Sequence, residues 1–206
     1  MSDLSSSLDG ARHWTVRHRK GQLIYDEGEP SEAMYRVAEG CVRLQVNGPK
    51  GDRQIVAFLF PGDMFGLDLD RRNASAEAVT DVVLTRYSLQ SVMELSSRSS
   101  QVTVELIASA NALYGDLVHH VQQITHLSSV ERVLWFLHWL AKREEPRTTS
   151  GPVTLPMSRR DIGDYLGLTP ETLSRAIRQL KDEGQITTRG LRAITLKRPV
   201  FTLRAA

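Results

Sequence analysis

Four residues near the carboxyl end of the chain have side chains and spacing that suit contact with DNA. Glu171, Ser174, Arg175 and Arg178 are three or four positions apart, so on a helix they share one outward face. An arginine can donate two hydrogen bonds to O6 and N7 of guanine, and a glutamate can accept one from N4 of cytosine. A helix with this face is therefore suited to recognise base pairs in a major groove.

The surrounding stretch, residues 157–175, has the pattern of a helix, a tight turn and a second helix. Ser158 is placed to cap the first helix, and Asp161 follows three residues later, as in a capping box. Gly167 ends that helix, because only glycine takes the left-handed conformation without steric cost. Thr169 is placed to cap the second helix, which has a proline at its first position. The pattern predicts a helix-turn-helix whose second helix enters the major groove.

Segments on both sides extend this part of the chain. Ser128 and Glu131 form a second capping-box pattern, which begins a helix that ends near Arg143, and residues 144–152 form a polar loop. After Gly184, the segment QITTRGLRAITL predicts a β-hairpin, which can lie along DNA as a wing. The side chains that we expect to contact DNA phosphates are Ser158, Arg160, Thr169, Thr172, Arg178 and Arg192.

The first half of the chain has a pattern typical of antiparallel β structure. From Val16 to about Tyr87, short apolar runs are separated by turns that contain glycine. Residues 42–47 alternate apolar and polar, which predicts a half-buried strand, and NGPKGD, residues 47–52, predicts a hairpin loop. We expect a β-roll or jelly roll. Residues 1 to about 12 are expected to form a mobile tail.

From Ser88 onward the apolar spacing becomes helical. Ser88 is placed to cap a short helix through Leu95, and a long helix is predicted from about Arg98 to Leu127. One apolar series on it, which we call the inner seam, has heptad spacing and is expected to meet the same helix of a second subunit. A neighbouring edge, which we call the outer seam, is expected to cover the β domain. The alternative is that the whole stripe packs within one chain, but a helix of about 30 residues outruns the core of a small domain. The inner seam comprises Leu106, Ala110, Leu113, Leu117, His120, Ile124 and Leu127, and the outer seam comprises Ile107, Tyr114, Val118 and Val121.

Charge is distributed unevenly, although the formal net charge is only +2. From Met157 to the end there are ten Lys plus Arg against five Asp plus Glu, and the rest of the chain has sixteen against nineteen. A basic carboxyl-terminal part is expected if that part alone meets phosphates, and a scattered solvated surface is the alternative. The single cysteine, Cys41, excludes an intramolecular disulfide, and no apolar run approaches the roughly 18 residues that span a membrane. We expect a cytoplasmic protein without membrane contact.

The order of a β-roll, a long helix and a winged helix-turn-helix resembles the CRP/FNR superfamily of bacterial transcription regulators. The most specific stretch is residues 155–184, LPMSRRDIGDYLGLTPETLSRAIRQLKDEG, which is similar to the FNR and FixK branch with its Glu-x-x-Ser-Arg recognition helix. PGDMFGLD, residues 61–68, and AEAVT, residues 76–80, are also FixK-like. The resemblance implies that Glu171, Ser174 and Arg175 read a TTGA-type inverted repeat, with Arg175 on the guanine. Pro170 replaces an arginine of the cyclic-AMP branch, so the outermost base contact of that branch is expected to be missing.

The same resemblance guides the expectation about effectors. Cyclic-AMP receptors carry a glutamate where this chain has Leu67, which can accept no hydrogen bond, and their phosphate-binding Arg-Ser pair aligns loosely with Arg72 and Asn73. We therefore expect no cyclic nucleotide. One cysteine cannot hold an iron–sulfur cluster, and FixK-like proteins in general act without a small effector. A haem-type effector stays an alternative, and its candidate axial ligands are His13, His18, His119 and His120.

Together these patterns predict an α+β protein with a β-roll over residues 1–95, a dimerisation helix over 96–127 and a winged helix-turn-helix over 128–206. We expect a homodimeric regulator, an activator that binds double-stranded DNA and RNA polymerase and needs no cofactor or metal. The alternative is an effector-dependent regulator whose β-roll binds a small anion, nucleotide or haem-type ligand near Arg72 and Asn73. An enzyme with a metal-containing β-roll is disfavoured, because no histidine lies between His18 and His119.

Overall fold

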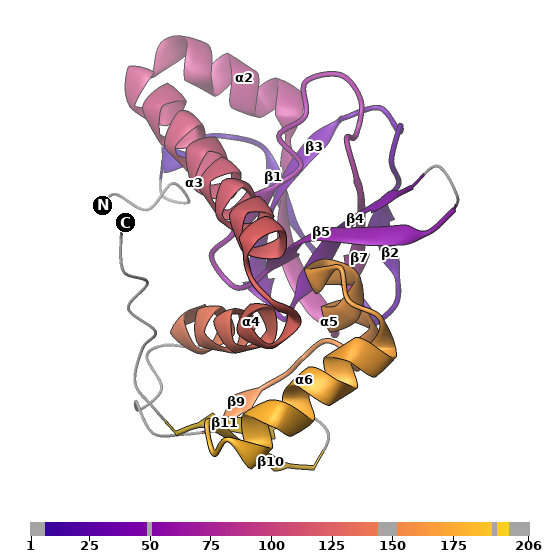
Figure 1. Ribbon diagram of the computed structural model, residues 1–206. Helices are drawn as coiled ribbons and strands as arrows, with labels where there is room; N and C mark the ends of the chain where they lie inside the picture. The colour runs from indigo at the N-terminus through magenta and orange to yellow at the C-terminus, as the bar shows by residue number, and fades with distance from the viewer. Residues whose placement is uncertain (1–6, 49–50, 144–151, 191–192, 198–206) are drawn as a thin grey trace. The chain divides into compact units, whose positions relative to one another are not determined.

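The computed structural model describes residues 7–48, 51–143, 152–190 and 193–197, and the chain divides into two compact units, Met1–His119 and His120–Ala206 (Figure 1). The boundary falls inside the long helix α3, Ser100–His126, which belongs to both units. The sequence pattern instead predicts a separate dimerisation helix over residues 96–127 between the two domains. No helix of the described residues is both long and apolar enough to span a membrane.

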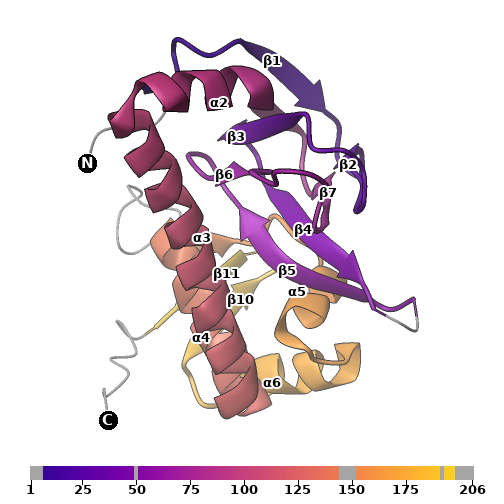
Figure 2. The same cartoon turned by 90° about the horizontal axis from the view of Figure 1, so that it is seen from above.

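The first unit contains two four-stranded antiparallel sheets, as the sequence predicts (Figure 2). One sheet has the order β1–β8–β3–β6, and the other has the order β2–β7–β4–β5. The strands of the first sheet are β1 His13–His18, β8 Val82–Ser88, β3 Ala33–Glu39 and β6 Met64–Phe65. Those of the second are β2 Leu23–Tyr25, β7 Ser75–Ala78, β4 Val42–Asn47 and β5 Arg53–Leu59.

An inter-sheet core explains the alternation in β4. Val42 and Leu44 are buried in this core with Leu84 of β8 and Val37 of β3, while the polar residues between them are only partly buried. Successive side chains of a strand point to opposite faces of its sheet, so alternate residues of β4 enter the core. The β4–β5 hairpin pairs Asn47 with Arg53 across the predicted NGPKGD turn, of which residues 49 and 50 lie outside the described residues.

A second, smaller core corrects the expectation of a mobile tail over residues 1–12. Leu8 is 0% exposed and Ala11 is 4% exposed, and both pack with Val92 of α2, Leu89–Arg98, and with Val102 of α3. Isolated apolar residues in a serine-rich segment gave no periodic signal, although burying them stabilises the docked chain. Residues 1–6 lie outside the described residues. Ser88 caps α2, as predicted.

The two apolar edges of α3 differ in burial from what the heptad pattern predicts. Leu106 of the inner seam packs against the second core, Leu113 packs against the inter-sheet core, and His120 is buried. Ala110 is exposed, and the remaining inner-seam residues, Leu117, Ile124 and Leu127, are half-buried. All four residues of the outer seam are exposed. Three inner-seam residues therefore pack within the chain itself, at odds with the prediction that the whole seam meets a second subunit.

The second unit has α4, α5 and α6 with a three-stranded sheet of order β10–β11–β9 (Figure 1). Their bounds are α4 Ser129–Arg143, α5 Arg159–Leu166, α6 Pro170–Asp182, β9 Val153–Thr154, β10 Ile186–Arg189 and β11 Ala193–Leu196. The pairing of Ile186 with Leu196 and of Arg189 with Ala193 confirms the predicted hairpin. The sequence pattern missed β9, which has two residues and pairs with the far strand of that hairpin.

Candidate nucleic-acid interface

The first helix of the motif is fixed at its start by a full capping box. Ser158 Oγ accepts a hydrogen bond from the Asp161 backbone N–H at 3.1 Å, and Asp161 Oδ2 accepts one from the Ser158 N–H at 3.0 Å. The Ser158 hydroxyl also donates to Asp161 Oδ2 at 2.7 Å. These reciprocal bonds satisfy backbone donors that the helix itself leaves unpaired. The predicted start of α5 is confirmed.

The turn depends on two glycines. Gly167 has a φ of +64°, a left-handed conformation, and ends α5 as predicted. Gly163 was not identified from the sequence as a turn residue, yet a Cβ at this position would lie 2.8 Å from the carbonyl oxygen of Leu168. The chain after the turn therefore passes directly over Gly163, and only a residue without a side chain permits that approach. The close turn sets where α6 begins.

The recognition helix α6 is anchored on one face and free on the other. Thr169 caps it by accepting from the Thr172 N–H at 3.2 Å, and its buried face comprises Leu173, Ala176, Ile177 and Leu180. The side chains of Glu171, Ser174 and Arg175 are exposed and have no hydrogen bond or ion pair to another described residue. The structure thus places the three predicted base-reading side chains on one exposed face, where their polar groups have no partner among the described residues.

The predicted phosphate-contacting residues have different surroundings. Arg160 and Arg178 are exposed, whereas the hydroxyl groups of Ser158, Thr169 and Thr172 already take part in the capping bonds. Arg192 lies outside the described residues. The neighbouring exposed arginine of the hairpin, Arg189, is in β10 just before the turn.

Arg72 and Asn73, the two β-roll residues that the resemblance connects with an effector, lie in different surroundings. Arg72 is 4% exposed and donates from Nη2 to the Ala33 carbonyl at 2.6 Å and from Nη1 to the Gly66 carbonyl at 2.8 Å. Its guanidinium lies 4.1 Å from the centre of the Tyr25 ring. Asn73 is instead exposed and donates to Asp68 Oδ1 at 2.7 Å. The predicted pair is therefore split between the interior and the surface.

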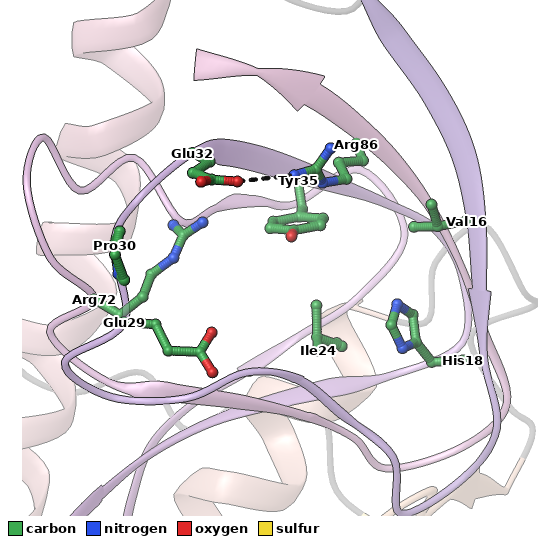
Figure 3. Close-up of a pocket in the computed structure, with 9 residues that line it drawn as sticks. All are labelled: Val16, His18, Ile24, Glu29, Pro30, Glu32, Tyr35, Arg72 and Arg86. Atoms are coloured by element: carbon green, nitrogen blue, oxygen red, sulfur yellow. Dashed lines mark ion pairs between the residues drawn. The ribbon is translucent and has the colours of Figure 1, made fainter. Parts of the chain in front are cut away.

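A cavity of about 350 Å³ lies beside Arg72 (Figure 3). Arg72 and Glu29 are on one side of it and His18 on the other, and Arg86 is 4.0 Å from Glu32 across its upper edge. Acidic and basic groups are thus mixed in its lining. Burial lowers the pKa of His18 below its ordinary value of 6.5, which favours the neutral imidazole.

Within the described residues, no group of three His, Cys, Asp or Glu side chains is arranged to hold a metal ion. Two of the histidines considered for haem already use a ring nitrogen. His13 Nδ1 lies 2.9 Å from the Ala11 carbonyl, and His120 Nε2 lies 2.7 Å from the Tyr165 carbonyl. Cys41 is buried, just before β4.

Two family models match the chain, a cyclic nucleotide-binding domain over residues 15–99 and a Crp-like helix-turn-helix domain over residues 131–200. The nitrogen fixation regulation protein FixK of Rhizobium meliloti is 34% identical over 183 residues, which cover 88% of this chain and 82% of FixK. The transcriptional activatory protein AadR of Rhodopseudomonas palustris is 29% identical over 89% of this chain and 78% of AadR. The solved structure of FixK2 from Bradyrhizobium japonicum is 37% identical, covers 91% of this chain and 93% of that one, and superposes with a TM-score of 0.85. The chain therefore belongs to the FixK-like branch of the CRP/FNR superfamily of DNA-binding transcription regulators.

Proposed function

We propose that the protein binds DNA as a homodimer and reads a TTGA-type inverted repeat through Glu171, Ser174 and Arg175. The observation that carries this proposal is the state of α6. One face is buried, and the three side chains on the other face are exposed without polar partners. Such groups keep their full hydrogen-bonding capacity for the base edges of the major groove. Two copies related by a twofold axis place two such helices in successive major grooves, about 10 bp apart.

Binding to a labelled duplex tests this proposal. Fluorescence anisotropy compares a TTGA-type inverted repeat with a duplex that has one intact half-site and with a random duplex of equal length. Binding by a dimer predicts a clear preference for the repeat over the single half-site, because both recognition helices then contribute. Equal affinities for all three duplexes would remove the proposed mode of recognition.

The outer seam supports a homodimer through α3. Tyr114 is 67% exposed, and Ile107 and Val121 are each 57% exposed. With Val104 and Val118 they follow steps of three, four and seven residues, so they form one apolar edge on the helix, interrupted at Asn111. Apolar residues on such an edge are costly to leave in water, and pairing with the same edge of a second copy removes them from it. We therefore assign the outer seam to the subunit contact.

A matched pair of charge substitutions separates dimerisation from folding. Val121→Glu places a carboxylate in the outer seam and is expected to dissociate the dimer in sedimentation equilibrium. His119→Glu introduces the same group at an exposed position outside the seam and is expected to leave the dimer intact. A dimer that survives Val121→Glu unchanged would exclude this surface.

We propose further that no cyclic nucleotide is needed for DNA binding. Two amino groups of Arg72 are engaged by main-chain carbonyls, and the aromatic rings of Tyr25, Tyr35 and Phe65 pack together between the sheets. A ligand phosphate would have to replace these bonds. Purified protein is therefore expected to bind the inverted repeat without additives, and cyclic AMP is expected to produce no heat in calorimetry and no change in affinity.

One observation favours the alternative of an effector-dependent regulator. Arg72 Nε is buried and has no hydrogen-bond partner, and Arg72 lines the cavity of Figure 3. A small anion in this cavity would satisfy that nitrogen. DNA binding that appears only after a nucleotide or another small anion is added would favour this alternative over effector-free binding.

An activating role and contact with RNA polymerase complete the proposal. The name of AadR describes an activator, which supports the same role here. Transcription in vitro from a promoter with an upstream inverted repeat is expected to rise when the protein is added. Unchanged or lower transcript yield would contradict activation at that promoter.

A further inference from the structure

The carboxyl end of α5 is held by two side chains from outside the helix-turn-helix. The last four carbonyl groups of a helix have no partner within the helix. His120 Nε2 lies 2.7 Å from the Tyr165 carbonyl oxygen, and because a carbonyl oxygen only accepts, Nε2 is the donor. Arg132 Nη1 donates to the Leu166 carbonyl at 3.2 Å. Helices α3 and α4 thus each supply one donor to the end of α5.

The His120 bond is sheltered from water. His120 is 5% exposed, and its ring stacks on the Tyr165 ring with 3.8 Å between the ring centres. The ring of Trp135 in α4 lies nearly parallel to the His120 ring, with 6.3 Å between the ring centres. A polar side chain in such surroundings fixes geometry, because losing its bond would leave a buried carbonyl unsatisfied. The bond also lies at the negative end of the helix dipole, where donors are favoured.

His120 is next in sequence to the outer seam. Val118 and Val121, both exposed, flank it within one turn of α3. We propose that His120 is a positioning residue that transmits the subunit contact on the outer seam to the helix-turn-helix. Packing of Val118 and Val121 against a partner helix fixes this turn of α3, and the bond from His120 then fixes the end of α5. Because the turn packs Leu168 closely against Gly163 and the Leu168 N–H donates to the Gly163 carbonyl at 3.0 Å, α6 follows α5.

This inference rests on the proposed homodimer and predicts an effect on half-site spacing. A dimer whose two recognition helices are held firmly discriminates against inverted repeats with one base pair more or less between the half-sites. If the His120 bond is lost, each helix-turn-helix has more freedom relative to α3, and this discrimination falls. Affinity for the best repeat falls as well, because the free helices must be ordered on binding.

The experiment compares His120→Leu, which has no donor, with His120→Gln, whose amide N–H can replace Nε2. The full-length proteins are titrated with three inverted repeats, the preferred spacing and spacings one base pair shorter and longer. We expect His120→Leu to bind the preferred repeat roughly 10-fold more weakly and to lose most of its spacing preference, whereas His120→Gln keeps both. His119→Gln, the same substitution at the exposed neighbouring residue, is expected to match the wild type.

A weaker affinity with an unchanged spacing preference would overturn the proposal, because a smaller folded fraction lowers binding to all three repeats alike. If His120→Leu does not fold, His120→Asn takes its place. Its amide is one carbon shorter than that of His120→Gln, so the Asn variant is expected to lose the spacing preference that the Gln variant keeps. Equal preferences in these two variants would overturn the proposal. A wild-type protein that is monomeric, or indifferent to spacing, would refute the homodimer itself.

Discussion

Replacing Arg175 with alanine gives the sharpest test of base reading. Arg175 is exposed and has no polar partner among the described residues, so its removal is expected to change the free energy of unfolding by no more than about 0.5 kcal/mol. One bidentate arginine–guanine pair contributes about 1–3 kcal/mol to discrimination. The proposed dimer carries two such pairs, so the expected loss on the inverted repeat is roughly 2–6 kcal/mol, or about 30-fold to about 20,000-fold in Kd.

Arg178→Ala is a matched control, because it removes the same charge from an exposed position three residues further along α6. If Arg178 contacts a phosphate, its loss weakens binding to specific and random duplexes alike. Anisotropy titrations of both variants against both duplexes, at several salt concentrations, separate the charge effect from base reading. Arg175→Ala is also expected to relax selectivity at one base pair in each half-site. Equal losses on the specific and the random duplex for Arg175→Ala would refute its role as a base reader.

Three further predictions concern stability, and the first two are checked by urea unfolding of the full chain. Leu8→Ala removes a side chain that is 0% exposed and is expected to cost about 2–5 kcal/mol, while a cost near zero would show that residues 7–12 do not dock. Ser158→Ala removes the cap of α5 and is expected to cost about 0.5–2 kcal/mol, and an unchanged midpoint would argue against the capping box. Burial, and secondarily Lys142, lower the pKa of His138 below its ordinary value of 6.5, so the unfolded chain binds the proton more tightly. This contribution to stability is present above pH 6.5 and is lost as the pH falls below it, and an NMR titration of His138 with a midpoint at or above 6.5 would contradict the prediction.

The helix-turn-helix was predictable because its signals are local. Ser158, Gly167 and Thr169 each determine a helix end through bonds or backbone angles within a few residues of themselves. Gly163 is the exception, since its role depends on the Leu168 carbonyl that crosses over it after the turn. A glycine inside a helical stretch is itself a signal of close approach, and it was the one clue that the sequence offered.

The features that were missed depend on contacts between distant segments. Strand β9 has only two residues, and it exists because Val153 pairs with Ile194 of the hairpin. Leu8 is buried because α2 and α3 complete a core around it, which no pattern in residues 1–12 reveals. The split of Arg72 from Asn73 has the same origin, because the interior position of Arg72 depends on carbonyls at residues 33 and 66. Local periodicity carries no information about any of these partners.

The two seams of α3 show the limit of the heptad argument. Successive residues of a helix are rotated by about 100°, so two apolar series offset by one residue form adjacent edges, and either satisfies the same pattern. The position of the chain's own cores decides between them, and those cores take Leu106 and Leu113. His120 was the clue within the sequence, because a buried imidazole needs a hydrogen-bond partner and a seam of aliphatic side chains offers none. Its partner is the Tyr165 carbonyl of the same chain, so His120 faces inward, while Tyr114 and Val121 on the neighbouring edge are exposed, where we propose the subunit contact.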